Sequence, residues 1–301
     1  LREMTGAGMM DCKKALNETN GNMDEAVEFL RKNGQAKAEK KASRIAAEGL
    51  CMVVTKDDQT AAVVEVNSET DFVAKNATFQ EFVKAVATQA VNSDAADMDA
   101  FMAEKWNEDA SKTVSEALVE KVAVIGENLK IRRFEKVVAE HGCVVPYVHG
   151  GGRIGVIVDA DTDVVNDTVK EAMHNIAMQI AALNPKYVSR DEVSADYIAH
   201  EKEILLAQIM NDPKESQKPE KVINGMIEGR ISKELKEVCL VDQVYVKAED
   251  GKQTVAKYLE EVSKAVGGTV KVKRFVRFET GEGLEKKQED FAAEVAAQMN
   301  A

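Results

Sequence analysis

Apolar residues in the first part of the chain recur with the spacing of short helices that are separated by glycine turns. Asp11–Thr19 predicts one such helix, with its apolar side chains on one face. Asn22, with a Glu three residues later, is a start signal for the next helix, which we expect to end at Gly34. Together with the end of a preceding helix and a Lys- and Ala-rich helical tether, these segments predict a small three-helix unit over residues 1–46.

Beyond residue 46 the pattern changes to short β-branched strands that alternate with amphipathic helices. The first half of this region, residues 47–139, is predicted to contain two hairpin strands, two helices and a closing strand, at Leu50–Thr55, Ala61–Val66, Phe79–Val91, Ala110–Gly126 and Leu129–Val138. The second half, residues 140–284, repeats this order, with an additional strand in the middle, at Val144–Val148, Ile154–Asp159, Asp167–Leu183, Leu240–Lys247, Thr254–Val266 and Val270–Phe278. We therefore predict an α+β fold whose core has two related halves with small antiparallel sheets.

The second half also contains an insertion at about residues 191–238. Two long, highly charged helical stretches, Asp191–Met210 and Pro219–Val238, flank a turn. Two antiparallel helices that protrude as a hairpin would account for both the length and the charge. The last segment, residues 285–301, is predicted to form an amphipathic C-terminal helix.

Composition narrows the functional classes. Of the 301 residues, 45% are hydrophobic and 31% are charged, and the formal net charge is −12. Such a charge disfavours general binding to nucleic acid, and no apolar run approaches the roughly 20 residues of a membrane span. Residues 1–46 carry nine Lys or Arg and seven Asp or Glu, so a slightly basic head precedes an acidic body. This asymmetry favours two separate contact surfaces.

Residues that carry chemistry are sparse. The four cysteines form no CxxC pair and favour reduced thiols in a cytoplasmic protein. The four histidines form no ligand pair at helical spacing, and the chain has no phosphate-binding loop of the kind found in GTPases. We therefore expect no metal, no cofactor and no enzymatic reaction centre.

Two short motifs resemble known sites but lack the required context. Gly150–Gly155 matches GxGxxG, yet a strand follows it where a dinucleotide site needs a helix. Asp159–Asp163 resembles the start of a calcium loop, yet Val164 and Lys170 stand where such a loop needs Gly and Glu. We expect a glycine turn and an acidic turn, respectively, and keep an enzyme that uses the glycine turn as an alternative.

Phe72 is the residue for which spacing and chemistry leave two interpretations. It lies in Thr70–Lys75, between a predicted strand and a predicted helix, and it follows the charged Asp71. Most Phe side chains are buried, so spacing alone favours a side chain that caps the core beneath the hairpin. An exposed Phe would instead suit an anchor in a protein interface.

Two longer segments resemble a known family. Leu1–Leu16, with the sequence LREMTGAGMMDCKKAL, and Thr70–Asn76, with the sequence TDFVAKN, are similar to bacterial elongation factor Ts, for which we expect the proteobacterial type. Weaker similarity continues in the same order to Asp290–Val295. The resemblance implies a ubiquitin-associated-like head and a guanine-nucleotide exchange factor of translation elongation without bond chemistry. Such a factor binds elongation factor Tu with GDP, promotes GDP release by disturbing the magnesium and phosphate site, and stays bound until GTP binds.

The resemblance also implies roles for individual residues. The corner that disturbs the magnesium site of Tu is matched by Asp71, Phe72, Val73 and Ala74. Contacts to the GTP-binding domain of Tu are implied for Arg2, Met9, Met10, Ile125 and Gly126, and a contact to the third domain of Tu for His149. No direct nucleic-acid or membrane partner is expected, and a homodimer or a dimer of heterodimers stays open. An adaptor with the same head but without exchange activity is the alternative.

Overall fold

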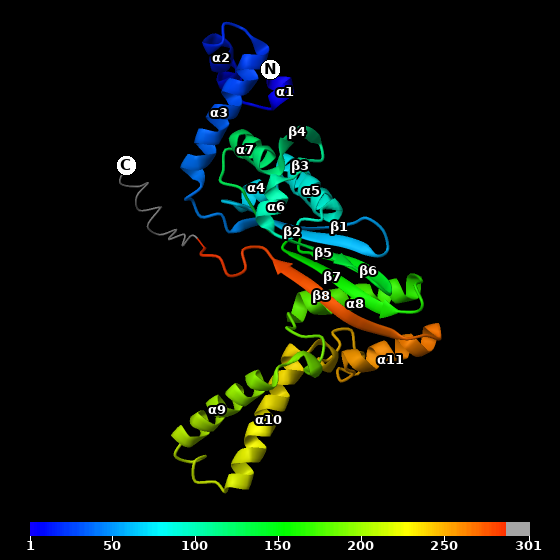
Figure 1. Ribbon diagram of the computed structural model, residues 1–301. Helices are drawn as coiled ribbons and strands as arrows, with labels where there is room; N and C mark the ends of the chain where they lie inside the picture. The colour runs from blue at the N-terminus through cyan, green and yellow to red at the C-terminus, as the bar shows by residue number, and fades with distance from the viewer. Residues whose placement is uncertain (287–301) are drawn as a thin grey trace.

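The computed structural model describes residues 1–286 and shows an elongated molecule, with a helical head at one end, two sheets in the middle and a helical hairpin at the other end (Figure 1). The predicted C-terminal helix, at Asp290–Met299, lies outside the described residues. Among the residues that the structure describes, no helix is both long and apolar enough to cross a membrane.

Three helices form the head: α1 (Arg2–Thr5), α2 (Met9–Glu18) and α3 (Met23–Lys41). The predicted start of α3 is confirmed, because the Asn22 side chain accepts hydrogen bonds from the backbone N–H groups of Asp24 and Glu25, at 3.1 and 3.2 Å. The predicted end at Gly34 is wrong. Gly34 does not take a positive φ; it is buried in the middle of α3, where that helix packs against α7 (Val114–Ile125).

Gly34 determines how closely the head can approach the body. A Cβ atom at this position would lie 3.6 Å from the Cβ of Ala123 and 3.9 Å from the Cγ1 of Val119 in α7, so an alanine fits and a longer side chain does not. We expect Gly34→Ala to leave the free energy of unfolding unchanged or to raise it by up to about 1 kcal/mol, because Ala favours a helix. Gly34→Leu should lower it by about 1–3 kcal/mol through overpacking. Chemical denaturation followed by circular dichroism measures both changes, and equal stability of the two variants would contradict this packing.

The first half of the body is a three-stranded antiparallel sheet with helices on one face. Its strands are β1 (Glu48–Thr55), β2 (Thr60–Ser68) and β5 (Lys130–Val138), in the order β1-β2-β5. The segments between β2 and β5 form α4 (Asp71–Ala74), α5 (Ala77–Asn92), α6 (Met98–Ala103), the small hairpin of β3 (Lys105–Trp106) and β4 (Asp109–Thr113), and α7. Phe79, Val83 and Val86 of α5 pack in one apolar cluster with the side chains of β2.

One boundary in this half differs from the prediction. The residues expected to begin a helix at Ala110 belong to β4 instead. The reason is local: the Thr113 side chain accepts a hydrogen bond from the Glu116 N–H, and the Glu116 carboxylate accepts the Thr113 N–H in return. This reciprocal cap starts α7 at Val114.

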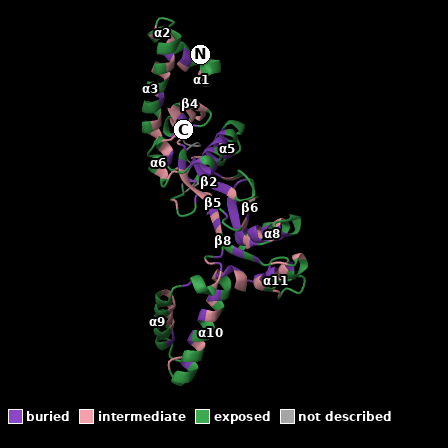
Figure 2. Ribbon diagram, turned by 45° about the vertical axis from the view of Figure 1, so that its right-hand side comes forward, coloured by how far each residue is buried: buried purple, intermediate pink, exposed green. Residues whose placement is uncertain are grey.

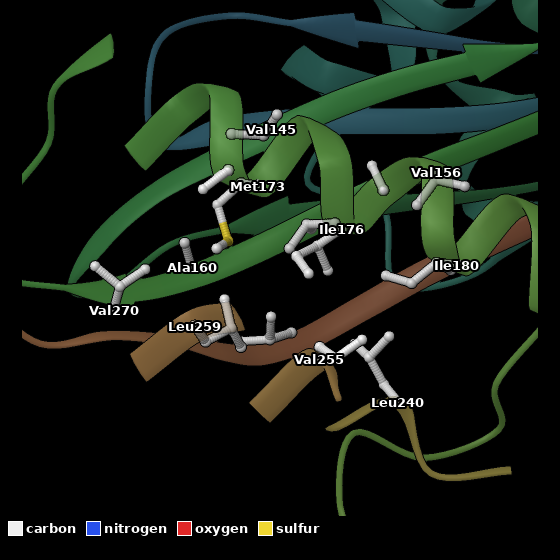
Figure 3. Close-up of a cluster of buried hydrophobic side chains, with 14 of the residues drawn as sticks. Val145, Val156, Ala160, Met173, Ile176, Ile180, Leu240, Val255, Leu259 and Val270 are labelled. Atoms are coloured by element: carbon white, nitrogen blue, oxygen red, sulfur yellow. The ribbon is translucent and has the colours of Figure 1, made fainter. Parts of the chain in front are cut away.

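The second half repeats the arrangement of the first. Its strands are β6 (Gly142–His149), β7 (Ile154–Thr162) and β8 (Val270–Glu279), in the order β6-β7-β8. The outer face of this sheet is covered by α8 (Asp167–Leu183) and α11 (Val255–Val266). Figure 3 shows Met173, Ile176 and Ile180 of α8 above β7. In both sheets the second hairpin strand is central and the closing strand lies beside it, so the predicted α+β fold with two related halves is confirmed.

The additional strand that was expected at Leu240–Lys247 is not formed. Leu240 begins a short 3-10 helix, η2 (Leu240–Asp242), and its fully buried side chain belongs to the apolar cluster beneath α11. The buried side chain of Gln243, in the same segment, accepts a hydrogen bond from the Gln179 amide of α8 at 3.2 Å. The apolar pattern of this segment therefore reflects burial under a helix; Val244 forms an isolated antiparallel bridge with Thr254 but no strand.

The two sheets pack face to face. Cys51, Ala61 and Val63 of the first sheet meet Ile157 and Val276 of the second in a shared apolar cluster. Figure 2 shows this buried centre, with the exposed residues concentrated on the head and the hairpin. The body is consequently a stack of helices, sheet, sheet and helices.

A buried carboxylate lies at one end of this seam. The side chain of Glu65, on β2, is fully buried and forms ion pairs with Arg132 at 3.0 Å and Arg133 at 2.5 Å. It also accepts a hydrogen bond from the backbone N–H of Gly281, beyond β8, at 2.8 Å. Glu65 thus links the first sheet to the residues that follow the second.

The predicted helical hairpin is confirmed as α9 (Ala195–Asn211) and α10 (Glu220–Val238), which protrude from the second half (Figure 1). Four residues of α10 at intervals of four pack toward α9: Ile223, Ile227, Ile231 and Leu235. The first helix starts later than predicted, because the Ser194 side chain caps it.

Candidate partner-binding site

The segment around Phe72 forms a one-turn helix, α4, at the corner between β2 and α5. Thr70 starts this turn, because its hydroxyl accepts the backbone N–H of Val73 at 3.3 Å. The Phe72 side chain is 80% exposed, which makes it the most exposed large apolar side chain among the described residues. The interpretation of Phe72 as a cap on the core is therefore wrong, and the alternative of an exposed aromatic side chain holds.

The residues next to Phe72 anchor the corner by packing against the core and by an ion pair. Ala74 is buried and Val73 is partly buried against the apolar cluster under the first sheet. Asp71 forms an ion pair with Lys75, with 2.6 Å between the carboxylate oxygen and the ammonium nitrogen. The hydrogen bond from Lys75 holds the pKa of the Asp71 carboxyl below its ordinary value of 3.8. The corner therefore presents an apolar ring beside a charged pair.

Ile125 and Gly126 lie at the end of α7 and meet the same corner. Gly126 ends the helix with a φ of 89°, a conformation that favours glycine. The next residue, Glu127, accepts a hydrogen bond from the Thr70 hydroxyl at 2.7 Å. Ile125 is partly buried against the first-half core. The structure thus brings two segments, separated by more than 50 residues in the sequence, to one edge of the body.

The head carries a second apolar surface. Met9 and Met10 begin α2 and are 66% and 73% exposed, and Arg2 on α1 is exposed as well. Met4, which was not selected from the sequence, is 69% exposed as well. A methionine beside the same glycine turn was the signal that could have identified it. Figure 1 shows α2 at the far end of α3 from α4, whereas Met4 of α1 lines a cleft with Val124 of α7.

His149 lies on neither surface. It is exposed at the end of β6 in the second sheet, and its Nδ1 shares a hydrogen bond with the Tyr147 hydroxyl at 2.9 Å. The Tyr147 ring also packs edge-on against His174 of α8. An aromatic patch of one tyrosine and two histidines therefore marks a third position on the body.

The glycine motif forms a turn between two antiparallel strands, as expected. The three glycines of the turn, Gly150 to Gly152, have positive φ, and the strand β7 follows. The carbonyl of Gly152 accepts the Cys51 N–H of β1 at 2.7 Å, so the turn fastens the two sheets to each other. Gly152 has a φ of 102°, which L side chains rarely adopt, and this conformation explains the need for glycine at this contact.

A cleft of about 330 Å³ lies between the head and α7. Its walls combine apolar residues such as Leu30, Ala123 and Val124 with charged residues such as Lys37 and Glu116. Within residues 1–286, no group of three or more His, Cys, Asp or Glu residues is arranged to hold a metal ion. The described features that stand out are exposed apolar side chains on an ordered body, and such surfaces are typical of proteins that bind another protein.

Comparison with known proteins identifies the family. A family model described as Elongation factor TS matches residues 69–282. The chain is 52% identical over 300 residues to Elongation factor Ts of Clostridioides difficile (strain 630), covering 99% of this chain and 96% of that protein. It is 50% identical over 301 residues to Elongation factor Ts of Clostridium novyi (strain NT), covering 100% and 96%. The chain therefore belongs to the elongation factor Ts family.

Membership of this family makes the chain a guanine-nucleotide exchange factor of translation elongation, which performs no bond chemistry. The expectation of a proteobacterial type is not borne out, because these relatives come from clostridia. The two segments that carried the resemblance identified the family but not its branch.

Proposed function

We propose that the chain binds the GDP-bound form of elongation factor Tu and accelerates GDP release by inserting Phe72 between helices of the Tu GTP-binding domain. The 80% exposure of this ring, on a corner whose neighbours are anchored, is the observation that carries the proposal. Burying a Phe side chain in a partner gains roughly 1.5–3 kcal/mol, so an exposed and well-held Phe is suited to be an interface anchor.

The mechanism requires no reaction at the factor itself. A magnesium ion is often the largest local charge in a phosphate site, so displacing the elements that hold it weakens the binding of GDP. A factor that binds empty Tu better than GDP-bound Tu weakens GDP binding by the same ratio, as linkage demands. In this proposal GDP leaves from the ternary complex, and GTP then displaces the factor.

Further contacts of the proposal extend along the molecule. Ile125 and Gly126 flank the Phe72 corner, and Arg2, Met9 and Met10 give the head a contact to the same Tu domain. His149, at the end of β6, would face the third domain of Tu. The exposure of the two methionines and of His149 supports these assignments, because surfaces used for binding must be accessible in the free protein.

Release of a labelled nucleotide tests the proposal. Tu loaded with fluorescent GDP is mixed with excess unlabelled GDP, and the decay of fluorescence is followed at increasing concentrations of the protein. The rate should rise and then saturate, as expected for a ternary complex. A decay that does not change at any concentration would overturn the proposed exchange of GDP on Tu.

Compartment and stoichiometry are also part of the proposal. We place the protein in the cytoplasm, where four buried free cysteines would stay reduced. A homodimer or a dimer of heterodimers with Tu is supported by exposed apolar side chains on the hairpin, namely Leu206, Met210 and Val222. Light scattering of the protein alone and with Tu distinguishes these assemblies from a monomer.

A further inference from the structure

One carboxylate fastens the Phe72 corner to the end of α7. The Oε2 atom of Glu127 accepts the backbone N–H groups of Glu69 and Thr70, at 3.0 and 3.1 Å. Its Oε1 atom accepts the hydroxyl of Thr70 at 2.7 Å. Three donors of the segment that leads into α4 therefore converge on a single side chain from a different part of the sequence.

A second bond runs in the opposite direction. The Glu69 carboxylate accepts the backbone N–H of Asn128 at 2.6 Å, and it also contacts the guanidinium of Arg44 at 3.4 Å. The Asn128 amide in turn donates to the Arg44 carbonyl at 2.8 Å. Glu69 and Glu127 thus connect the segment before α4 to the segment after α7. Arg44, which lies shortly after α3, contacts both segments.

The corner depends on this support. An isolated helical turn of four residues is not stable in water, because nucleation fixes several dihedral angles for one hydrogen bond. The Phe72 ring cannot hold the turn, since it projects into solvent. The bond by which Thr70 caps Val73 is long, at 3.3 Å, whereas its bond to Glu127 is short and charge-assisted. Glu127 therefore holds Thr70, the residue that caps α4, together with the Ser68 hydroxyl, which donates to the Thr70 carbonyl at 2.9 Å.

We propose that Glu127 is a positioning residue for nucleotide exchange: it holds Phe72 in the orientation needed for insertion, without touching the partner's nucleotide site. This inference rests on the proposed function of Phe72. A corner that is ordered before binding loses less conformational freedom when Phe72 inserts into Tu. We therefore expect Glu127 to increase the rate of GDP release from the complex. The head and the second sheet supply separate contacts and should keep most of the affinity for Tu.

The test separates maximal rate from half-saturation in the GDP-release assay. Glu127→Ala removes all three acceptor bonds, and we expect the maximal rate of stimulated release to fall roughly tenfold, as for the net loss of about one hydrogen bond to a charged group. The half-saturating concentration of the factor should change less than about threefold, because contacts outside the corner remain. A rise in half-saturation with an unchanged maximal rate would overturn the positioning role.

Conservative and matched variants complete the design. In Glu127→Gln, the amide oxygen can accept both backbone N–H groups while its NH2 group donates to the Thr70 hydroxyl, so the maximal rate should recover to within about twofold of the natural protein. The control is Glu116→Ala, which removes the carboxylate half of the reciprocal cap at the other end of α7. It should lower the stability of the protein and leave the maximal rate unchanged. A loss of rate in the control equal to that of Glu127→Ala would show a merely structural effect.

A double-mutant cycle with Phe72→Ala gives the sharpest outcome. If Glu127 acts through Phe72, Glu127→Ala has no further effect on the maximal rate once the ring is absent. If the two substitutions lower the maximal rate independently, so that their fold-losses multiply in the double variant, the inference is overturned. Thr70→Val removes the hydroxyl bond to Glu127 together with the cap on Val73 and keeps the two backbone bonds to Glu127. It should show a loss with the same dependence on Phe72 and serves if the alanine variant fails to fold. If the natural protein itself does not accelerate release, the proposed function fails, a result that is distinct from any outcome of the cycle.

Discussion

Phe72→Ala is expected to lower stimulated GDP release from Tu by roughly 30-fold or more, the effect of losing an interface anchor worth about 2 kcal/mol. The same change should leave the free energy of unfolding within about 0.5 kcal/mol of the natural protein, because the ring is 80% exposed and packs on nothing in the free chain. Rates of labelled GDP release at saturating factor, and chemical denaturation of each variant, measure the two quantities.

Val138→Ala is a matched control for this prediction. Val138, at the end of β5, is also a large apolar side chain at the surface, with 51% exposed, but it lies at the other end of the sheet from the corner. Its truncation should change the release rate by less than about twofold, as for a residue outside the energetic centre of an interface. Undiminished release by Phe72→Ala at equal concentration would remove the ring from the mechanism.

Glu65→Ala is expected to lower the free energy of unfolding by about 3 kcal/mol, since it leaves Arg132 and Arg133 without their buried partner. We place the effect at the lower end of the range for buried pairs because both arginine side chains retain some contact with water. The loss should also free the N–H of Gly281, so the seam between the sheets loosens at that end. Urea denaturation monitored by far-ultraviolet circular dichroism measures the change.

Glu135→Ala is the corresponding control. Glu135 lies on β5 and pairs with Arg274 at 3.5 Å, but its side chain is 43% exposed. An exposed ion pair contributes less than about 1 kcal/mol, so this variant should remain close to the natural protein. Equal destabilisation by the two substitutions would contradict the special role of the buried carboxylate.

The same carboxylate gives the protein a predictable response to acid. Burial alone would raise the pKa of Glu65, but the hydrogen bonds from Gly281 and Asn67 and the charges of the two arginines outweigh it, and the pKa lies below its ordinary value of 4.5. The stabilisation is therefore complete above the unfolded-state pKa and is lost as the pH falls through the lowered folded-state pKa. In denaturation from about pH 5 to pH 3, Glu65→Gln should lose stability less steeply than the natural protein.

The strands and most helices of the fold could be predicted because their apolar spacing is local. Gly34 could not be assigned correctly from the sequence, since a glycine that permits close packing of two helices looks the same as one that ends a helix. Leu240–Lys247 failed for a related reason: a short apolar run fits a strand as well as a buried turn, and only the position of α11 decides between them.

The candidate site likewise contains one residue that the sequence indicated and one that it did not. The spacing around Phe72 favoured burial, and only the resemblance to a family argued for an exposed ring. Glu127 was not selected at all, because its three donors lie 57 and 58 residues away and only the fold brings them together. The contacts of Glu127 could therefore be recognised only in the folded structure, whereas the segment around Phe72 could be recognised in the sequence.

The face-to-face packing of the sheets has a consequence for dividing the molecule. A fragment that ended near residue 139 would leave Ala61, Val63 and Val137 on an open sheet, with no second sheet to cover them. A fragment of the second half would expose Ile157 and Val276 in the same way. Such pieces should aggregate or pair when expressed alone.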